Sequence, residues 1–202
     1  MLSIRKSAAL GIRAHSGWAV TVVVALTGRG LEVLERRKVI VADPKLPGTK
    51  QPFHFAEPLP LKDAEAHLAR CARDSVGLAL EAVRQVCDAL AERGYRPGGC
   101  GDLTASGRAL PELASILASH ALIHTAEGEF FRDIFREACR KLQVPLSAIR
   151  ERDLFNLASA QMGISLADLN RQLSDTGRAI GPPWAQDQKH AALAGWMVLA
   201  NR

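Results

Sequence analysis

The chain has 202 residues, a length that suits one domain or one domain with an appendage. Hydrophobic residues make up 48% of it, and the longest apolar run, 20–26, is too short to cross a bilayer, which excludes a membrane-spanning protein. The net charge is +5 with acids and bases interleaved, which suits an anionic partner without requiring one. The four cysteines form no CxxC pair, so we expect reduced cysteines, a cytoplasmic location and no membrane partner.

Two strands are predicted near the start of the chain. Residues 11–17 resemble a turn leading into a first strand at 18–26, whose β-branched residues indicate burial on both faces. Residues 31–41 carry charges in their middle, as an outer strand does, and the link at 28–30 predicts a hairpin. A short third strand is expected at 53–55, where side-chain polarity alternates.

A long helix and a glycine-rich segment follow. Residues 62–93 have helical periodicity and end at Gly94, which predicts a helix about 45 Å long at 1.5 Å per residue. Residues 97–107 form a strand or a loop. Their glycines either supply positive φ in a loop or cradle a phosphate with backbone amides, although the complete phosphate-loop pattern is absent.

Residues 121–126 fit either a strand or the continuation of a short helix that begins near Pro111. We favour the strand, because isoleucine and threonine cluster there and Gly128 then opens an amphipathic helix ending near residue 142. On a helix, His120, His124 and Glu127 would share one face, as zinc ligands do. On a strand the two histidines lie about 13 Å apart, so the strand argues against a zinc site.

The rest of the chain predicts a helical extension. A connector or strand is expected at 147–156, a helical turn at 163–169, loops at 176–178 and 181–183, and a final helix at 184–199. We therefore predict an α/β core of a mixed β-sheet with flanking helices at 1–150. Residues 151–202 are the extension, whose terminal helix packs on the core.

Three short motifs stand within this order of elements. The run from Gly11 and Ile12 to Gly17 and Trp18 leads into a strand, Glu127 precedes a helix, and 187–194 places an acid before an alanine-rich apolar face. The order and the motifs resemble the ribonuclease H-like superfamily, which includes Holliday-junction resolvases and actin-like ATPases. The resolvase branch opens its first strand with Gly-Ile-Asp, whereas this chain has Arg13 in place of the aspartate.

The resemblance implies a site in which converging carboxylates hold Mg²⁺ or Mn²⁺. It gives catalytic roles to Glu127, Asp187 and Glu129, metal-binding roles to Glu127, Asp187 and Asp102, and phosphate contacts to Arg13, His15, Arg132 and Arg136. A guanidinium cannot ligate a cation and repels it, so the substitution at Arg13 predicts a degraded or altered metal site.

Our leading hypothesis is a nucleic-acid-associated member of this superfamily, and both an active and an inactive enzyme fit the sequence. One alternative is a non-catalytic binding or scaffold protein that forms a homo-oligomer through an exposed apolar face. Another is an actin-like nucleotide-binding protein that uses its glycine turns. Simpler interpretations are also open: acids such as Glu127 and Glu129 favour helix starts, and Arg132 and Arg136 fit a solvated helix face.

Overall fold

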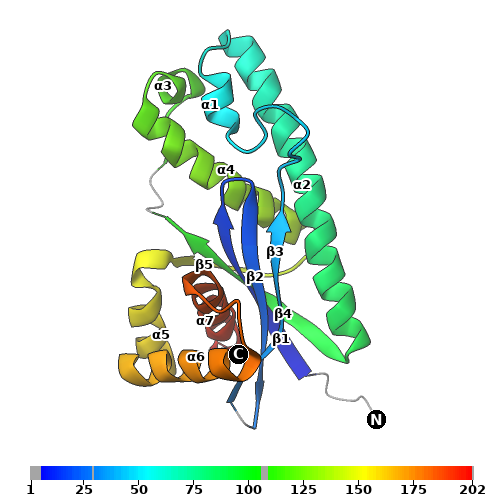
Figure 1. Cartoon of the computed structure of the whole chain (residues 1–202), viewed down its shortest axis with the longest axis vertical. Helices are drawn as coiled ribbons and strands as arrows, with labels where there is room; N and C mark the ends of the chain where they lie inside the picture. Colours follow the sequence, from blue (N-terminus) through cyan, green and yellow to red (C-terminus); the bar gives the residue numbers. More distant parts are fainter. Residues whose placement is uncertain (1–5, 29, 106–108, 202) are drawn as a thin grey trace.

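The computed structural model describes residues 6–28, 30–105 and 109–201, and within these ranges five strands form one sheet in the order β3-β2-β1-β4-β5 (Figure 1). β1 is antiparallel to β2, and β2 to β3, whereas β4 runs parallel to β1 and β5 parallel to β4. The sheet is therefore mixed, as the sequence predicts. The strands are β1 (Lys6–His15), β2 (Trp18–Thr27), β3 (Gly30–Ile40), β4 (Tyr95–Thr104) and β5 (Leu146–Arg150).

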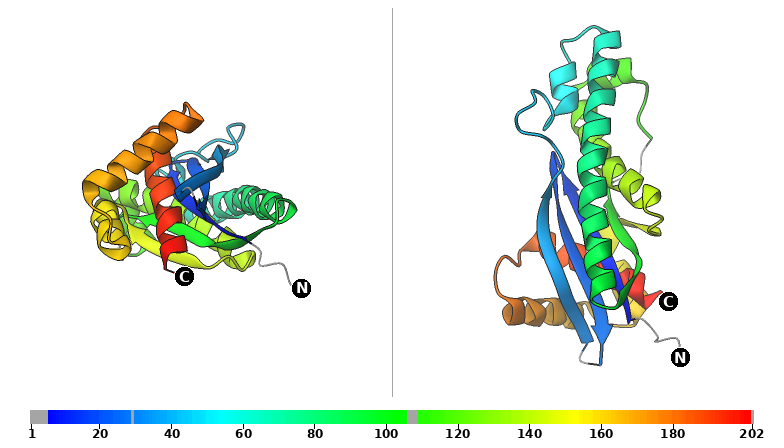
Figure 2. Two further views of the ribbon diagram at one scale, coloured as in Figure 1. Left: turned by 90° about the horizontal axis from the view of Figure 1, so that it is seen from below. Right: turned by 90° about the vertical axis from the view of Figure 1, so that its right-hand side faces the viewer.

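Helices cover both faces of the sheet (Figure 2). α2 and α4 pack on one face, and α7 lies across the other face with α5 and α6 outside it. α1 and α3 join the start of α4 in a small separate core beside α2, around Phe53 and Ile123 (Figure 1). The helices are α1 (Pro52–Ala56), α2 (Leu61–Glu92), α3 (Leu113–Leu117), α4 (His120–Lys141), the 3-10 turn η1 (Glu151–Asp153), α5 (Leu154–Met162), α6 (Leu166–Ile180) and α7 (Gln186–Ala200).

Alternation along the strands decides which residues meet which helices. On β1, Leu10 and Ile12 belong to the core under α2 and α4, while Ala9 belongs to the core under α7. On β4, Cys100 faces α2 and α4, and Leu103 faces α7. Polar residues near the carboxyl ends of these strands are therefore divided between the two faces.

α7 approaches the sheet so closely that glycine is required beneath it. A Cβ added to Gly11 on β1 would lie 1.7 Å from the carbonyl oxygen of Ala191, and one on Gly101 of β4 would lie 2.5 Å from that of Ala194. Both distances are far below van der Waals contact, so neither strand tolerates a larger residue there. The glycines of β4 consequently serve packing and strand geometry. No open phosphate-binding turn lies at 97–105. The rest of that predicted motif, Ser106–Arg108, lies outside the described residues.

The predicted strand at 53–55 is wrong, because these residues form helix α1. Pro52 occupies its first turn, where its fixed φ and missing N–H are tolerated. Phe53 is buried edge-to-face against Phe130, with ring centroids 6.0 Å apart. Phe55, the other apolar residue of the apparent alternation, is 42% exposed, so the alternation does not mark a buried strand face.

The predicted strand at 121–126 is also wrong: these residues lie in α4, which runs unbroken through Gly128. Ile123 and Ala126 are buried three residues apart, as a helix requires. The loop predicted at 176–178 lies in α6, where Gly177 makes room for the ring of Trp184. A helix interior tolerates glycine when another side chain uses the space.

The sequence missed β1, because Lys6–His15 was interpreted partly as a turn. The long helix at 62–93 and the final helix at 184–199 are confirmed as α2 and α7 within a few residues. The division at residue 150 remains a prediction, but α7 packs directly on β1, β2 and β4. Among the described residues, no helix is both long and apolar enough to span a bilayer.

Candidate functional site

Five polar residues meet where β1 ends and α7 begins. Arg13 and His15 come from β1, Glu151 from η1 after β5, and Asp187 and His190 from the first turns of α7. Arg13 Nε donates a hydrogen bond to Glu151 Oε1 over 2.8 Å, and Arg13 Nη1 donates to Asp187 Oδ1. We call this group the Arg13 cluster. Its guanidinium bridges two carboxylates that approach from different elements.

The two histidines complete the Arg13 cluster. His15 Nε2 lies 3.2 Å from Asp187 Oδ1, and His190 Nδ1 lies 3.1 Å from Glu151 Oε1. Each carboxylate therefore has both a guanidinium and an imidazole partner. The arrangement satisfies the two acids with groups supplied by the chain itself.

The electrostatics of the cluster favour its charged form. The hydrogen bond from His190 and the charge and hydrogen bonds of Arg13 lower the pKa of Glu151 to about 2, against the opposing effect of burial. Burial acts to lower the pKa of Arg13, but Glu151 and Asp187 outweigh it and raise that pKa. A second cation, such as Mg²⁺, would have to displace a guanidinium that both acids already hold.

An open groove of about 430 Å³ borders the cluster at Asp187. In the groove the Trp18 ring stacks on His15 with centroids 4.1 Å apart, and Lys38 Nζ lies 4.0 Å from the centre of the Trp18 ring. Lys38 is exposed, whereas Arg36 donates to backbone carbonyls at 180–182. The groove therefore presents an aromatic ring with a cation over it; its lining residues are Trp18, Val20, Arg36, Arg37, Lys38, Pro183, Asp187 and Gln188.

Asp102 lies on the opposite face of the sheet from the Arg13 cluster. It pairs with Ile12 in register, so its side chain points toward α4, where Arg136 Nε donates to Asp102 Oδ2 over 2.6 Å. Burial raises the pKa of Asp102, while the charge of Arg136 opposes that rise. Glu129 joins the same network through Arg136 and Arg132. Two of the predicted phosphate contacts are therefore already paired with acids.

Glu127 occupies a third location. It is buried in α4, at 2% exposure, and faces His54 of α1. Asp187, Asp102 and Glu127 thus have three different partners, and within the described ranges they do not form a group close enough to share an ion. The fold brings Arg13, His15 and Asp187 together, and separately Asp102, Glu129, Arg132 and Arg136.

Sequence reasoning missed Glu151 and His190. Glu151 directly follows β5, and the carboxyl ends of the parallel strands β1, β4 and β5 meet at one edge of the sheet. His190 lies three residues after Asp187, on the same face of α7. Recognising β5 as a strand parallel to β4 would have pointed to Glu151.

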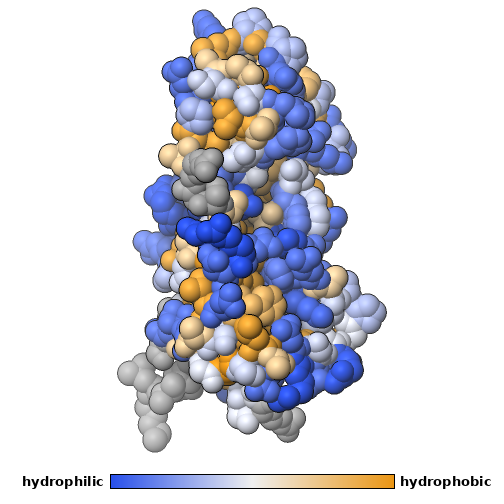
Figure 3. All heavy atoms as spheres, turned by 90° about the vertical axis from the view of Figure 1, so that its left-hand side faces the viewer, coloured by the Kyte–Doolittle hydropathy of each residue, from blue (hydrophilic) through white to orange (hydrophobic). Residues whose placement is uncertain are grey.

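Hydrophilic side chains also gather on the side of the molecule that carries β5. Figure 3 shows them as a band across the middle of that face, between upper and lower regions that expose apolar residues. The band lies at the level of β5 in Figure 1.

The sheet order, with two antiparallel strands on one side of β1 and two parallel strands on the other, defines a ribonuclease H-like α/β fold. The chain is similar to the structure of Thermus thermophilus RuvC, at 14% identity and a TM-score of 0.52, over 94% of this chain and 92% of that one. It is equally similar to T. thermophilus RuvC in complex with a Holliday junction substrate, at 13% identity and a TM-score of 0.52, over 95% and 91%. No protein-family model and no curated protein matches the sequence. The resemblance seen in the sequence is confirmed for the fold.

Proposed function

We propose that this protein binds nucleic acid through a ribonuclease H-like fold in which an internal ion pair replaces the divalent-ion site. One observation carries the proposal: the Arg13 guanidinium lies between Glu151 and Asp187 at the carboxyl end of β1. The family resemblance puts a metal-binding carboxylate at that position. A positive charge there supports an electrostatic role without a bound ion.

The groove beside the Arg13 cluster supports the nucleic-acid part of the proposal. Lys38 is an exposed cation over the Trp18 ring, which also stacks on His15, and its ammonium group can meet a phosphate. The net charge of +5 favours an anionic partner in general. One structurally similar protein is in complex with a Holliday junction, so a four-way DNA junction is the first ligand to test.

All four predicted phosphate contacts are paired with acids. Arg13 and His15 pair with Asp187 beside the groove, and Arg132 and Arg136 pair with Glu129 and Asp102. We therefore place the principal contact at Lys38. Arg132 and Arg136 remain predicted secondary contacts.

The described residues do not fit a Mg²⁺ or Mn²⁺ site of the predicted composition. An ion held by Glu127, Asp187 and Asp102 would require each acid to leave its own partner, His54, Arg13 or Arg136. Catalytic roles for Glu127, Asp187 and Glu129 therefore stay a prediction. Calorimetric titration with Mn²⁺, with Glu127→Gln as the control, tests it directly.

Fluorescence anisotropy with a labelled four-way junction and a duplex of the same composition tests the binding proposal. We expect junction affinity to fall steeply with salt, and Lys38→Ala to weaken it and to lower the salt slope by about one. Lys141→Ala on α4, whose side chain is also exposed, is the matched control and should change neither. Absence of binding to either DNA at low salt would overturn the proposal. Light scattering of the same samples tests the predicted homo-oligomer.

A further inference from the structure

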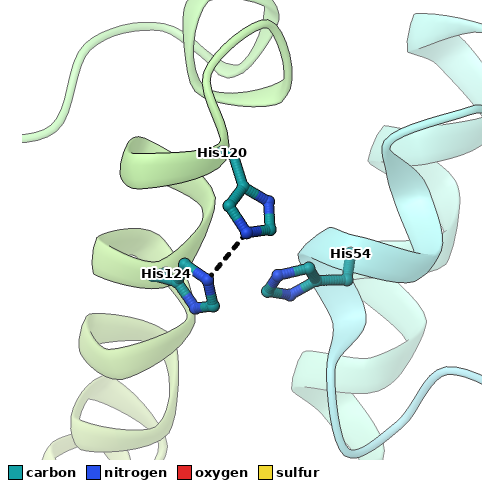
Figure 4. Close-up of side chains that lie close together, drawn as sticks. All are labelled: His54, His120 and His124. Carbon is teal, nitrogen blue, oxygen red and sulfur yellow. Dashed lines mark hydrogen bonds between the residues drawn. The ribbon is translucent and has the colours of Figure 1, made fainter.

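Three histidines from two helices face one another away from the Arg13 cluster (Figure 4). His54 lies on α1, and His120 and His124 lie one turn apart on α4. The Nε2 atoms of His120 and His124 are 3.1 Å apart, and the ring of His54 points toward the space between them. One ring nitrogen of each histidine lies within 4.8 Å of the others. We call these residues the histidine cluster.

We propose that the histidine cluster binds a zinc ion. Two imidazole nitrogens on a tetrahedral Zn²⁺, with bonds of 2.0–2.1 Å, lie about 3.3 Å apart, close to the separation found between His120 and His124. The third nitrogen reaches the same distance if the His54 side chain moves by an ångström or two. Side chains at i and i+4 on a helix provide such a pair without backbone change.

Glu127 positions His54 for this role. One carboxylate oxygen, Oε1, accepts a hydrogen bond from the backbone N–H of His54 over 3.3 Å, and Oε2 lies 2.9 Å from His54 Nδ1. His54 Nδ1 is buried, and because the latter pair is not aligned for a hydrogen bond, it has no hydrogen-bond partner among the described residues. If Nδ1–H is directed at the neighbouring carboxylate, Nε2 is the nitrogen left to bind the metal. Carboxylates that hold a ligating histidine in this way raise its basicity and fix its tautomer.

The ligand set selects the class of ion. Three imidazole nitrogens suit zinc and its neighbours among the transition metals, whereas Mg²⁺ requires oxygen ligands. His120 and His124 are exposed, so a fourth position opens to water. A bound ion joins α1 to α4 and adds to the small apolar core around Phe53 and Ile123 and to the contact between His54 and Glu127.

Zinc titration of the chelator-treated full-length protein against a chromogenic chelator tests the proposal. We expect one tight site per chain, at least 100-fold weaker binding in His120→Gln and His124→Gln, and 10- to 100-fold weaker binding in Glu127→Gln. His15→Gln, a histidine variant in the Arg13 cluster, is the matched control and should retain the site. Mg²⁺ in excess should not compete.

A folding measurement keeps the result interpretable. Circular dichroism should show that His120→Gln is folded, because His120 is exposed and its loss removes no buried contact. Equal zinc affinity in the wild-type protein and folded His120→Gln, or no tight site in either, would overturn the proposal. Neither outcome bears on nucleic-acid binding, since the groove at Lys38 contains none of the three histidines.

Discussion

The two polar clusters of this fold differ in whether their side chains have partners of opposite charge within the chain. In the Arg13 cluster, two carboxylates face a guanidinium, and every acid has a partner from the chain. In the histidine cluster, three donors of one kind face each other, and the carboxylate of Glu127 lies beside His54. The first cluster contains its own cation, whereas the second has the composition of a site that takes a cation from solution.

This difference predicts different consequences of mutation. The side chains of Arg13, Glu151 and Asp187 are only 19–26% exposed, so removing one charge leaves the others partly buried without compensation. His120 and His124 are exposed, and their loss leaves no buried group unpaired. Breaking the first cluster should therefore reduce stability, and breaking the second should reduce metal binding alone.

The largest effect is expected for Arg13→Asp. This change places three carboxylates together and should cost about 3 kcal/mol in the absence of metal, because breaking a buried pair typically costs 3–5 kcal/mol and this one is partly solvated. The melting temperature should fall by roughly 6–12 °C at this chain length. Mn²⁺ should restore part of the loss by replacing the guanidinium with a divalent ion. Thermal melts with and without Mn²⁺ measure both effects.

Arg140→Ala is the control for Arg13→Asp. Arg140 also pairs with a glutamate, Glu137, but its side chain is 70% exposed. The melting temperature of Arg140→Ala should match that of the wild-type protein, since exposed ion pairs contribute little to the free energy of unfolding. If Arg13→Asp without metal melted like Arg140→Ala, the Arg13 cluster would not be the structural unit described here.

A smaller, pH-dependent effect is expected for Glu151→Gln. The pKa of Glu151 is lowered from its ordinary value near 4.3 to about 2 in the folded protein. Its contribution to stability is therefore fully present above about pH 4.5 and is lost as pH falls toward 2. With allowance for its partial exposure, the difference at neutral pH should be about 2 kcal/mol.

Urea unfolding of wild type and Glu151→Gln at pH 7 and at low pH measures this contribution. The two proteins should differ at pH 7 and converge toward pH 2. Asp102 contributes with the opposite sign, because burial raises its pKa, but it is the same in both proteins and cancels in the difference. A gap between them that is equal at both pH values would show that Glu151 acts through packing instead of charge.

The sequence predicts the long helices better than it predicts the first strand. The periodicity of α2 and of the later part of α4 is visible because each helix buries one face along its length. β1 was missed because the close approach of α7 requires small residues such as Ala9 and Gly11, which resemble a turn. The close packing of α7 on β1 requires small residues, and these residues lack the local pattern that predicts a strand.

The sites were predictable only in part, because they depend on which face each residue occupies. The sequence pointed to Arg13 and Asp187, which the structure brings together. It could not show that Asp102 faces α4, since that follows from its register beside Ile12. The spacing of His120 and His124 fits one helix face, but the strand expected at 121–126 separates these two residues, which the helix places side by side.

The smallest change in the melting temperature of the metal-free protein is expected for His120→Ala. This variant tests the difference between the two clusters most directly. In chelator, this variant and wild type should melt at nearly the same temperature, because the His120 side chain is exposed. With free zinc at 100 times its Kd, wild type should gain about 2.7 kcal/mol, or roughly 5–11 °C, and the variant should gain nothing. Differential scanning fluorimetry at matched free zinc measures this, and Mg²⁺ at the same concentration is the control.

A zinc-dependent rise in melting temperature that persists in His120→Ala would mean that the ion binds elsewhere. A variant that melts well below wild type in chelator would mean that both clusters stabilise the fold.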